Sequence, residues 1–206
     1  TSDSRVQVKT GDLTDEGVPA ELIDTDEMCV VHLASMVSGN TEADPERGWQ
    51  VNVEGQRALL AAVRERAPGS RFLFTSSTAS LGAVGESEPT PDDRTKLVPQ
   101  NSYGFHKAVC EMMLNDASRR GYVDGRALRL PVIIVRPGAP NAAAVSDWSS
   151  IVREPLAGKP CPIGVPLDAT LPCASYQTVA AAAEFVLNDV DAADLGADRT
   201  LMLPSL

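Results

Sequence analysis

The sequence predicts an α/β fold with a mainly parallel sheet, and three observations support this prediction. Short apolar runs of strand length occur at 28–33 and 71–75, as expected for strands buried on both faces of a parallel sheet. Segments with helical spacing of apolar residues occur at 44–68 and 102–119. The two kinds of segment alternate along the chain, which is the pattern of α/β folds.

Three elements are expected in the first third of the chain. Residues 5–9 alternate in the manner of a strand, and a turn at Gly11 follows. Residues 28–33 form the next strand. Asp44 is a suitable N-cap with Pro45 at the first helical position, so a helix begins there. Its apolar side carries Trp49, Val53, Leu59, Leu60 and Val63.

The middle of the chain repeats this order of strand, loop and helix. Residues 71–75 form a buried strand, and the loop at 76–82 is small and rich in hydroxyl groups. The next helix begins at Asn101 or Ser102, since either side chain can accept a hydrogen bond from an unpaired backbone amide. Basic residues in its last turn and Gly121 just beyond are ordinary signals for a helix end.

Past this helix, residues 126–135 predict another strand. The pattern then loosens into a helix near 149–157, a proline-rich stretch, and an alanine-rich helix at 176–187. The sequence contains no internal repeat and no low-complexity tract. The last third therefore adds helices, with less regular spacing, to the α/β pattern.

Composition excludes several classes of partner. The 206 residues suffice for one domain with a sizeable core, and the net charge of −10 repels nucleic acid and anionic lipid. No apolar run approaches the roughly 20 residues of a membrane span. We therefore expect no nucleic-acid or membrane partner.

The four cysteines lack metal-ligand spacing, which predicts reduced thiols, a cytoplasmic location and no metal site. They are Cys29, Cys110, Cys161 and Cys173.

Polar and small residues follow the predicted strands. Parallel α/β sheets bind ligands at the carboxyl ends of their strands. Four segments fall at such ends: 12–13, 33–35, 76–78, and the residues from Pro131 onward. We therefore expect a ligand site along this edge of the sheet.

Tyr103 and Lys107 are the strongest chemical signal in the chain. They stand four residues apart on one helical face, and a nearby ammonium stabilises a phenolate that otherwise forms near pH 10. The pair makes sense for proton transfer, although alone such a pair is more often an exposed helix face. Ser77 ends the preceding strand and can meet Tyr103 over one crevice, although alone it is more often a turn hydroxyl.

Six motifs stand in a fixed order over nearly the whole chain: Gly-Asp-Leu (11–13), His-Leu-Ala-Ser (32–35), Val-Asn-Val-Glu-Gly (51–55), Phe-Thr-Ser-Ser-Thr-Ala-Ser-Leu-Gly (74–82), Ser-Tyr-Gly-Phe-His-Lys (102–107) and Leu-Arg-Leu-Pro (128–131). Together they resemble the extended short-chain dehydrogenase/reductase family, the NAD-dependent epimerases and dehydratases. The resemblance implies a Rossmann-type, doubly wound parallel sheet with a small C-terminal substrate-binding lobe. Residues 1–137 would form part of the dinucleotide-binding domain. Residues 138–206 would form part of the lobe, plus elements that return to the sheet.

The resemblance also implies roles for individual residues. Tyr103 would be the general base, Lys107 would lower its pKa and hold the nicotinamide ribose, and Ser77 would hydrogen-bond the reacting oxygen. The cofactor would be NAD, with NADP left open. An internal hydrogen bond to a loop is the alternative role for Asn52. The implied cofactor-binding residues are Asp12, Leu13, Leu33, Ala34, Ser35, Asn52, Thr75, Tyr103, Lys107 and Pro131.

Further motifs at 37–39, 114–121, 135–141 and 151–158 resemble the family members that oxidise D-erythronate, a small hydroxy acid. The implied activity is the NAD-dependent oxidation of such a sugar acid to its keto form, within carbohydrate metabolism. Arginine pairs well with planar anions, so Arg136 is a candidate for the substrate carboxylate. The implied substrate-binding residues are Ser38, Ser77, Thr78, Tyr103, Arg136 and Asn141.

Two other functions stay open. One is a nucleotide-sugar epimerase or dehydratase, against which Val132 argues because many such members carry an asparagine there. The other is a non-catalytic member that senses the cofactor, although Ser77, Tyr103 and Lys107 are all present. The resemblance also implies a homodimer built from the helices that begin near Asp44 and Tyr103.

The family's opening strand, glycine-rich turn and helix, which hold the cofactor pyrophosphate, have no counterpart in this sequence. The chain opens at what corresponds to the third strand of the family. A strand at 5–9 would then stand without a neighbour, and its backbone groups would be unpaired. We therefore expect the chain to be part of a longer protein.

Overall fold

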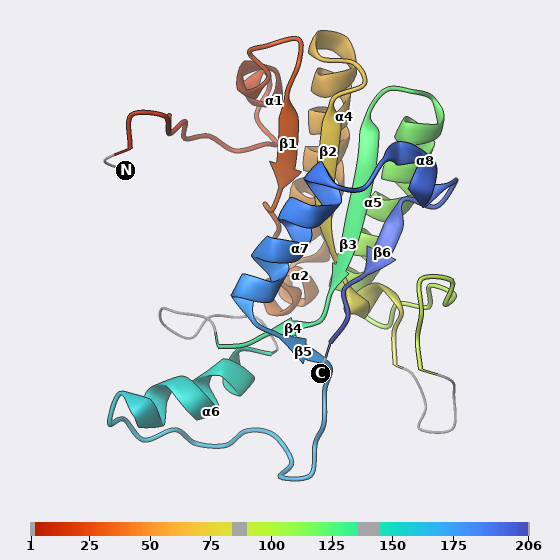
Figure 1. Cartoon of the computed structure of the whole chain (residues 1–206). Coiled ribbons are helices and arrows are strands. Elements are labelled where there is room, and N and C mark those ends of the chain that lie inside the picture. Colours follow the sequence, from red (N-terminus) through yellow and green to blue (C-terminus); the bar gives the residue numbers. More distant parts are fainter. Residues whose placement is uncertain (1–2, 84–89, 136–144, 206) are drawn as a thin grey trace.

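A computed structural model of the chain describes residues 3–83, 90–135 and 145–205. Four parallel strands form its main sheet, in the order β1-β2-β3-β6 (Figure 1). They are β1 (Cys29–His32), β2 (Arg71–Ser77), β3 (Asp124–Leu130) and β6 (Thr200–Met202). Two short strands, β4 (Val132–Ile133) and β5 (Cys173–Ala174), pair in parallel and form a separate sheet. The predicted α/β fold with a parallel sheet is confirmed.

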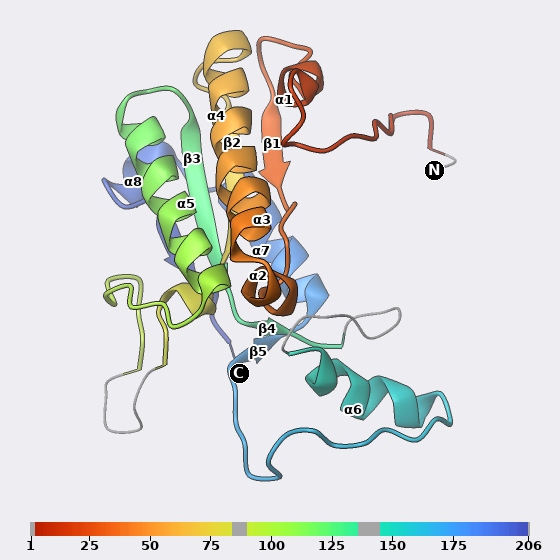
Figure 2. The same cartoon turned by 180° about the vertical axis from the view of Figure 1, so that it is seen from behind.

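Helices cover both faces of this sheet. Figure 2 shows α4 and α5 side by side on one face, and Figure 1 shows α7 over the other. A π-helical turn, η1, joins α3 to α4, and a 3₁₀ turn, η2, follows β2. The helical elements are α1 (Val18–Leu22), α2 (Ser38–Ala43), α3 (Pro45–Trp49), η1 (Gln50–Glu54), α4 (Gly55–Arg66), η2 (Thr78–Ser80), α5 (Ser102–Arg119), α6 (Ser146–Leu156), α7 (Tyr176–Asn188) and α8 (Ala192–Leu195).

The helix starts confirm the predicted caps. The Asp44 side chain accepts a hydrogen bond from the backbone N–H of Arg47, and Pro45 occupies the first position of α3. Of the two candidates at the start of α5, Asn101 is the N-cap: its side chain accepts the N–H of Gly104 at 2.8 Å. Both caps satisfy amides that have no partner inside the helix.

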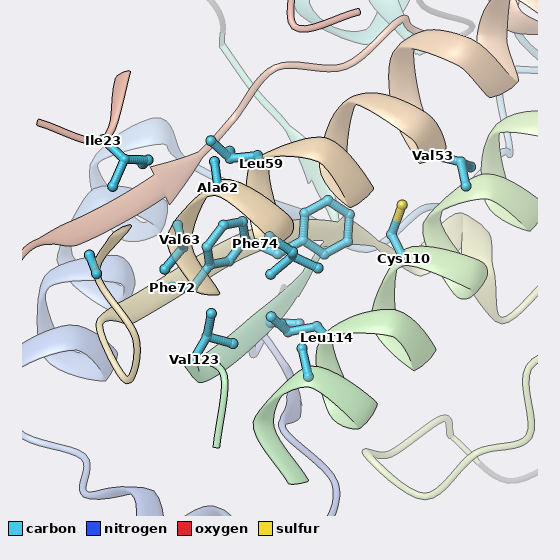
Figure 3. Packing of buried hydrophobic residues seen from close by; sticks show 14 residues of the cluster. Ile23, Val53, Leu59, Ala62, Val63, Phe72, Phe74, Cys110, Leu114 and Val123 are labelled. Carbon is cyan, nitrogen blue, oxygen red and sulfur yellow. The ribbon is translucent and has the colours of Figure 1, made fainter. Parts of the chain in front are cut away.

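Side chains of β2 divide the core into two layers. Phe72 and Phe74 point towards α4 and α5, where they pack with Val63 and Leu114 (Figure 3). Leu73 points the other way and packs with other apolar side chains of a second cluster that includes Val186 of α7. All of these side chains are buried, and burying each one fully contributes about 1.5–3 kcal/mol. This alternation follows from the period of two in a strand.

Three details of the predicted strands are wrong. Residues 5–9 form no strand: Val6 and Val8 are 49% and 71% exposed, and no described strand pairs with them. β1 is not buried on both faces, because it is the outer strand of the described sheet and α7 lies over β2 and β3 instead. The segment 126–135 is interrupted at Pro131, which has no N–H for a ladder, so β3 ends at Leu130 and β4 joins another sheet.

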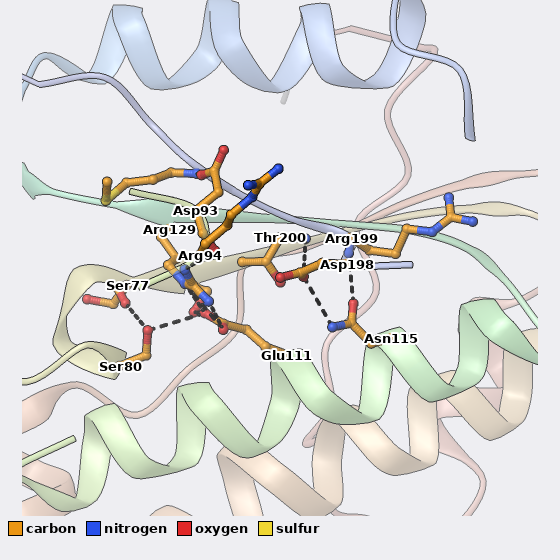
Figure 4. Close-up of polar contacts among 12 residues, drawn as sticks. Ser77, Ser80, Asp93, Arg94, Glu111, Asn115, Arg129, Asp198, Arg199 and Thr200 are labelled. Atoms are coloured by element: carbon orange, nitrogen blue, oxygen red, sulfur yellow. Dashed lines mark hydrogen bonds and ion pairs between the residues drawn. The ribbon is translucent and has the colours of Figure 1, made fainter. Parts of the chain in front are cut away.

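β6 was not predicted, and its place depends on contacts with α5. The Asn115 side chain of α5 donates to Asp198 at 3.2 Å and accepts the backbone N–H of Arg199 at 3.0 Å. The same carboxylate accepts the N–H of Thr200, the first residue of β6. These bonds, drawn in Figure 4, fix the start of a three-residue strand beside β3. Together with α7, β6 returns the chain to the main sheet.

Within the described residues, no helix has the length and apolar character needed to cross a membrane.

Candidate active site

The start of α5 lies directly against the turn that follows β2. Gly104 makes this approach possible, because a Cβ at that position would overlap the carbonyl oxygen of Ala79 in η2. Tyr103 precedes this glycine, and Ser77 is the last residue of β2. The structure therefore brings together the two elements that carry Ser77 and Tyr103, as the sequence predicted.

Lys107 is a buried ammonium in this region, with 3% of its surface exposed. Its Nζ donates a hydrogen bond of 2.7 Å to the carbonyl oxygen of Thr75. The same atom lies 4.6 Å from the ring centre of Phe74 and 5.5 Å from the ring centre of Tyr103. Lys107 and Tyr103 thus share one face of α5 and are within the range of a cation–π contact.

Burial has a large effect on Lys107. It lowers the pKa of the ammonium from 10.5 to about 8, against the opposing influence of Cys110 and Glu111. An ammonium near a phenol favours the phenolate and so lowers the pKa of the phenol. The geometry therefore places an ammonium beside Tyr103, as proton transfer by this pair requires, and the role of Tyr103 as a base stays a prediction.

Ser77 has a structural contact as well as a position at the site. Its Oγ accepts the N–H of Ala79 at 3.2 Å and so caps η2. A hydroxyl that accepts one bond keeps its own hydrogen for donation. Ser77 and its neighbour Thr78 are both partly exposed. Ser77 can therefore donate to an oxygen bound at the end of β2.

Asn52 makes the internal hydrogen bonds that were the alternative to a cofactor contact. Its Oδ1 accepts the N–H of Met36 at 2.7 Å and the Oγ–H of Ser35 at 3.2 Å. Its Nδ2 donates to the carbonyl oxygen of Met36 at 3.2 Å. Asn52 thus holds the loop after β1 in place, and its direct contact with a cofactor stays a prediction.

The remaining cofactor candidates of the sheet lie at strand ends. Leu33 and Ala34 follow β1 and are exposed, Leu33 to 65%. Thr75, near the end of β2, donates its hydroxyl to the carbonyl oxygen of His32 at 3.2 Å. Pro131 follows β3 and is buried, whereas the substrate candidate Ser38 opens α2 and is partly buried.

Asp12 and Leu13 do not follow a strand, contrary to the prediction. The Asp12 carboxylate accepts the N–H and hydroxyl of Thr14 and pairs with Arg47 of α3 at 2.6 Å. These bonds, chiefly those from Thr14, lower the pKa of Asp12. Leu13 lines an open hollow of about 490 Å³ between α1 and α4, which includes none of the Ser77, Tyr103 and Lys107 side chains.

Arg136 and Asn141, the candidates for the substrate carboxylate, lie outside the described residues. Their roles stay predictions.

The two histidines pack against aromatic rings. His32 is 4% exposed and stacks on Phe74, with ring centres 5.8 Å apart. Burial, with a smaller contribution from Lys107, lowers the pKa of His32 to about 4, so this ring is neutral at physiological pH. His106 packs edge-on against Trp49. Among the described residues, no group of three His, Cys, Asp or Glu side chains could hold a metal ion.

Three further polar residues lie near this region and were not among the predicted site residues. Glu42 of α2 accepts the backbone N–H of Ser102 at 2.9 Å and so provides a second cap for α5. Glu111 of α5 and Arg129 of β3 form a buried ion pair of 2.8 Å beneath the end of β2 (Figure 4). Glu111 stands one helical turn after Lys107, and this spacing was a signal that could have identified it.

The sequence matches the model of the "NAD dependent epimerase/dehydratase family" over residues 1–196. A D-erythronate dehydrogenase of Cupriavidus necator is 48% identical over 206 residues, covering 99% of this chain and 62% of that protein. A D-erythronate dehydrogenase of Haemophilus influenzae is 46% identical over 145 residues, covering 69% of this chain and 45% of its own length. The chain thus spans about three fifths or less of these curated relatives.

Among solved structures, a nucleoside-diphosphate-sugar epimerase of Agrobacterium tumefaciens superposes with a TM-score of 0.84 at 36% identity, over 96% of this chain and 58% of that one. A monomeric L-threonine 3-dehydrogenase from a metagenome superposes with a TM-score of 0.83 at 19% identity, over 100% of this chain and 66% of that one. The second similarity concerns the fold alone.

Proposed function

Because this chain belongs to the NAD-dependent epimerase/dehydratase family, we propose that it carries the acid/base part of the active site of an NAD-dependent oxidoreductase. The substrate is a small hydroxy acid such as D-erythronate. One observation carries the proposal: a buried ammonium, Lys107, lies 5.5 Å from the ring centre of Tyr103, on a helix that packs against the turn after Ser77.

The three residues have distinct tasks, and Lys107 would also hold the nicotinamide ribose. Tyr103, as the phenolate, accepts the proton of the substrate hydroxyl, and Lys107 stabilises that phenolate. Ser77 donates its O–H to the same substrate oxygen and holds it in place. NAD, when bound, supplies the acceptor for the hydride that leaves the substrate carbon. The hydroxy acid thereby becomes a keto acid, and the proton is held at the Tyr103 oxygen.

The side chains at the strand ends fit the cofactor. Leu33, exposed at the end of β1, offers an apolar surface, and the loop at Ser35 is held by Asn52. Ala34, Thr75 and Pro131 complete this edge, while Asp12 and Leu13 would flank the adenine. We propose NAD and leave NADP as the alternative.

The substrate class follows from two relatives named D-erythronate dehydrogenases and from charge. In a chain with a net charge of −10, an anionic substrate needs local cations that outweigh the repulsive field. We propose Arg136, with Asn141 as a second donor, for the carboxylate. Ser38 and Thr78 would contact the hydroxyl groups.

Two alternatives can be separated from this proposal by experiment. The similarity to a nucleoside-diphosphate-sugar epimerase supports an epimerase or dehydratase, whereas Val132 argues against one. The full protein should be incubated with NAD and either D-erythronate, other aldonates or UDP-sugars, with NADH followed by its absorbance and UDP-sugar products followed by chromatography, because epimerisation regenerates NAD and leaves no net NADH. We expect turnover of an aldonate. If a UDP-sugar is turned over and no aldonate is, the result would contradict the proposal. If calorimetry shows tight NAD binding and no compound is turned over, the result would favour the non-catalytic sensor.

A homodimer through α4 and α5 is part of the proposal. Phe105 and Met112 stand seven residues apart on α5 and are 48% and 61% exposed. Apolar side chains at this spacing form one stripe of a helix, suited to packing against another helix.

We also propose a cytoplasmic location, which agrees with the free state of the four cysteines.

A further inference from the structure

Glu111 is a buried carboxylate one helical turn beyond Lys107, with 2% of its surface exposed. Its Oε1 accepts hydrogen bonds from the hydroxyls of Ser76 and Ser80, the second at 3.3 Å. Arg129 donates to the same carboxylate through Nε at 3.1 Å and through Nη2 at 2.8 Å. Figure 4 shows the Arg129 and Glu111 side chains directed at one another between β3 and α5.

Arg129 extends these contacts to two more segments. It is 3% exposed, and its Nη1 donates to the carbonyl oxygen of Asp93 at 3.3 Å. The Asp93 carboxylate in turn accepts the backbone N–H of Met202 in β6. A single ion pair therefore connects α5, β3, the end of β2, the segment around Asp93, and β6.

A contribution to stability alone does not explain why a buried ion pair stands at this position. Removing two charges from water costs several kcal/mol per ion, and a well-packed apolar pair is often as stable. The position of the contacts is more informative. Ser76 and Ser80 stand on either side of Ser77, and the Ser80 hydroxyl also lies 2.8 Å from the Ser77 carbonyl oxygen. Glu111 is thus bound to the chain both before and after Ser77.

We propose that Glu111 and Arg129 are positioning residues for Ser77, Tyr103 and Lys107. Glu111 holds the strand end that carries Ser77 against the helix that carries Tyr103 and Lys107, and Arg129 holds Glu111. Neither residue touches the substrate. This inference rests on the proposed function, because it assigns the pair to the same acid/base set.

The pair has a second, electrostatic consequence. The groups that face Lys107 are Tyr103, Cys110 and Glu111 of its own helix, His32 of β1, and the Thr75 carbonyl of β2. Burial lowers the pKa of Lys107, whereas Cys110 and, to a smaller extent, Glu111 favour the ammonium and raise it. The positive charge of Arg129 acts against the ammonium. Glu111→Gln should therefore lower the pKa of Lys107, and Arg129→Gln should raise it.

A titration of Lys107 tests this without cofactor or substrate. The chain has only the lysines Lys9, Lys96, Lys107 and Lys159, so ¹³Cε-lysine NMR resolves Lys107 against exposed references. We expect opposite shifts of its pKa in Glu111→Gln and Arg129→Gln, and a value near wild type in the double variant. Unchanged values, or shifts in the same direction, would overturn the electrostatic part. If Glu111→Gln does not fold, the direction in Arg129→Gln decides.

Asp124→Asn is the matched control. Asp124 pairs with the buried Arg126 at 2.8 Å on the same strand, β3. It stands five residues before Arg129, roughly 16 Å along the strand. This variant should lower Tm, as loss of a buried pair does, and leave the pKa of Lys107 unchanged. If the pKa of Lys107 shifts as much in Asp124→Asn as in Glu111→Gln, a general loss of stability would be enough to change that pKa.

Ser80→Ala tests the positioning part, since it removes hydrogen bonds on one side of Ser77 and no charge. We expect kcat for the aldonate to fall by about tenfold or more, with KM within about twofold and the pKa of Lys107 unchanged. An unchanged kcat would overturn the positioning of Ser77. Absence of turnover in the wild type would contradict the proposed function instead, and the opposite Lys107 shifts would still decide whether the pair controls that ammonium.

Discussion

Lys107 donates a 2.7 Å hydrogen bond to the carbonyl oxygen of Thr75, two residues before Ser77. This bond joins the helix that carries the general base to the strand that carries the serine. It also satisfies a buried ammonium with a carbonyl oxygen, the partner that such a group needs when it leaves water. The same contact therefore contributes to the fold and to the chemistry proposed for the site.

The burial of Lys107 predicts a pH-dependent contribution to stability. Its pKa falls from 10.5 in the unfolded chain to about 8 in the folded one. Between these values the unfolded state binds more protons, so the free energy of unfolding rises with pH. Chemical denaturation of the wild type and Lys107→Met should show a difference in stability that changes by about 3 kcal/mol between pH 8 and 10.5 in this direction.

Cys110 acts with the opposite sign in part of the same range, because burial raises the pKa of its thiol to about 12. Lys107 and Cys110 alter each other's pKa, so the comparison is made in a Cys110→Ala background, where this contribution is absent from both proteins. A difference that stays flat with pH would show that Lys107 is not buried as an ammonium.

Gly104→Ala should impair both stability and turnover. The added Cβ would overlap the carbonyl group of Ala79. Because this is a backbone group, it cannot rotate away as a side chain could, so α5 must shift. We expect a loss of about 1–3 kcal/mol and, for a displacement near 1 Å, about 10²-fold in kcat. Gly55→Ala is the control, since a Cβ in that helix would make only ordinary contacts, the nearest at 3.4 Å to Leu13. Equal effects of both variants would contradict a special role for the approach at Gly104.

The proposed dimer predicts a difference between two exposed helix faces. Met112→Glu on α5 should give a monomer at micromolar concentration, because a charge in an apolar interface is costly. Phe185→Glu on α7, where Phe185 is 57% exposed, should leave the dimer intact. Light scattering measures both. A wild-type chain that is already a monomer would rule out this interface.

Arg136→Met should discriminate between charged and neutral substrates. Loss of a charge-assisted contact with the substrate carboxylate should raise KM for an aldonate by orders of magnitude. An analogue with a hydroxymethyl group in place of the carboxylate should be much less affected. Steady-state kinetics with both compounds checks this, and equal losses would indicate a structural role for Arg136.

Local signals were sufficient for part of the fold and of the site. The caps at Asp44 and Asn101 depend on neighbouring residues, and Tyr103 and Lys107 share a helical face because of their spacing. The strand predicted at 5–9 was wrong because a strand needs a pairing partner, which an alternating pattern does not supply. Glu111 and Arg129 were missed for a related reason. A charged residue usually indicates an exposed position, so the spacing of Glu111 from Lys107 was not used as a signal, and only the packing of β3 on α5 brings Arg129 to Glu111.

β6 was missed because three residues carry too little periodicity to predict a strand. Its stability comes from pairing with β3 and from the bonds between Asn115 and residues 198–199. Such contacts join positions more than 80 residues apart in the chain, and a reading of local patterns does not contain them.

The initial rate of NADH formation from D-erythronate by Tyr103→Phe, compared with the wild type, tests the central proposal most directly. The substitution removes only the phenolic oxygen, so the ring still packs and Tm should be nearly unchanged. Loss of a positioned general base should lower kcat by at least about 10²–10⁴-fold. A folded Tyr103→Phe variant that retains most of its kcat would contradict the role of Tyr103, and with it the acid/base set proposed for this chain.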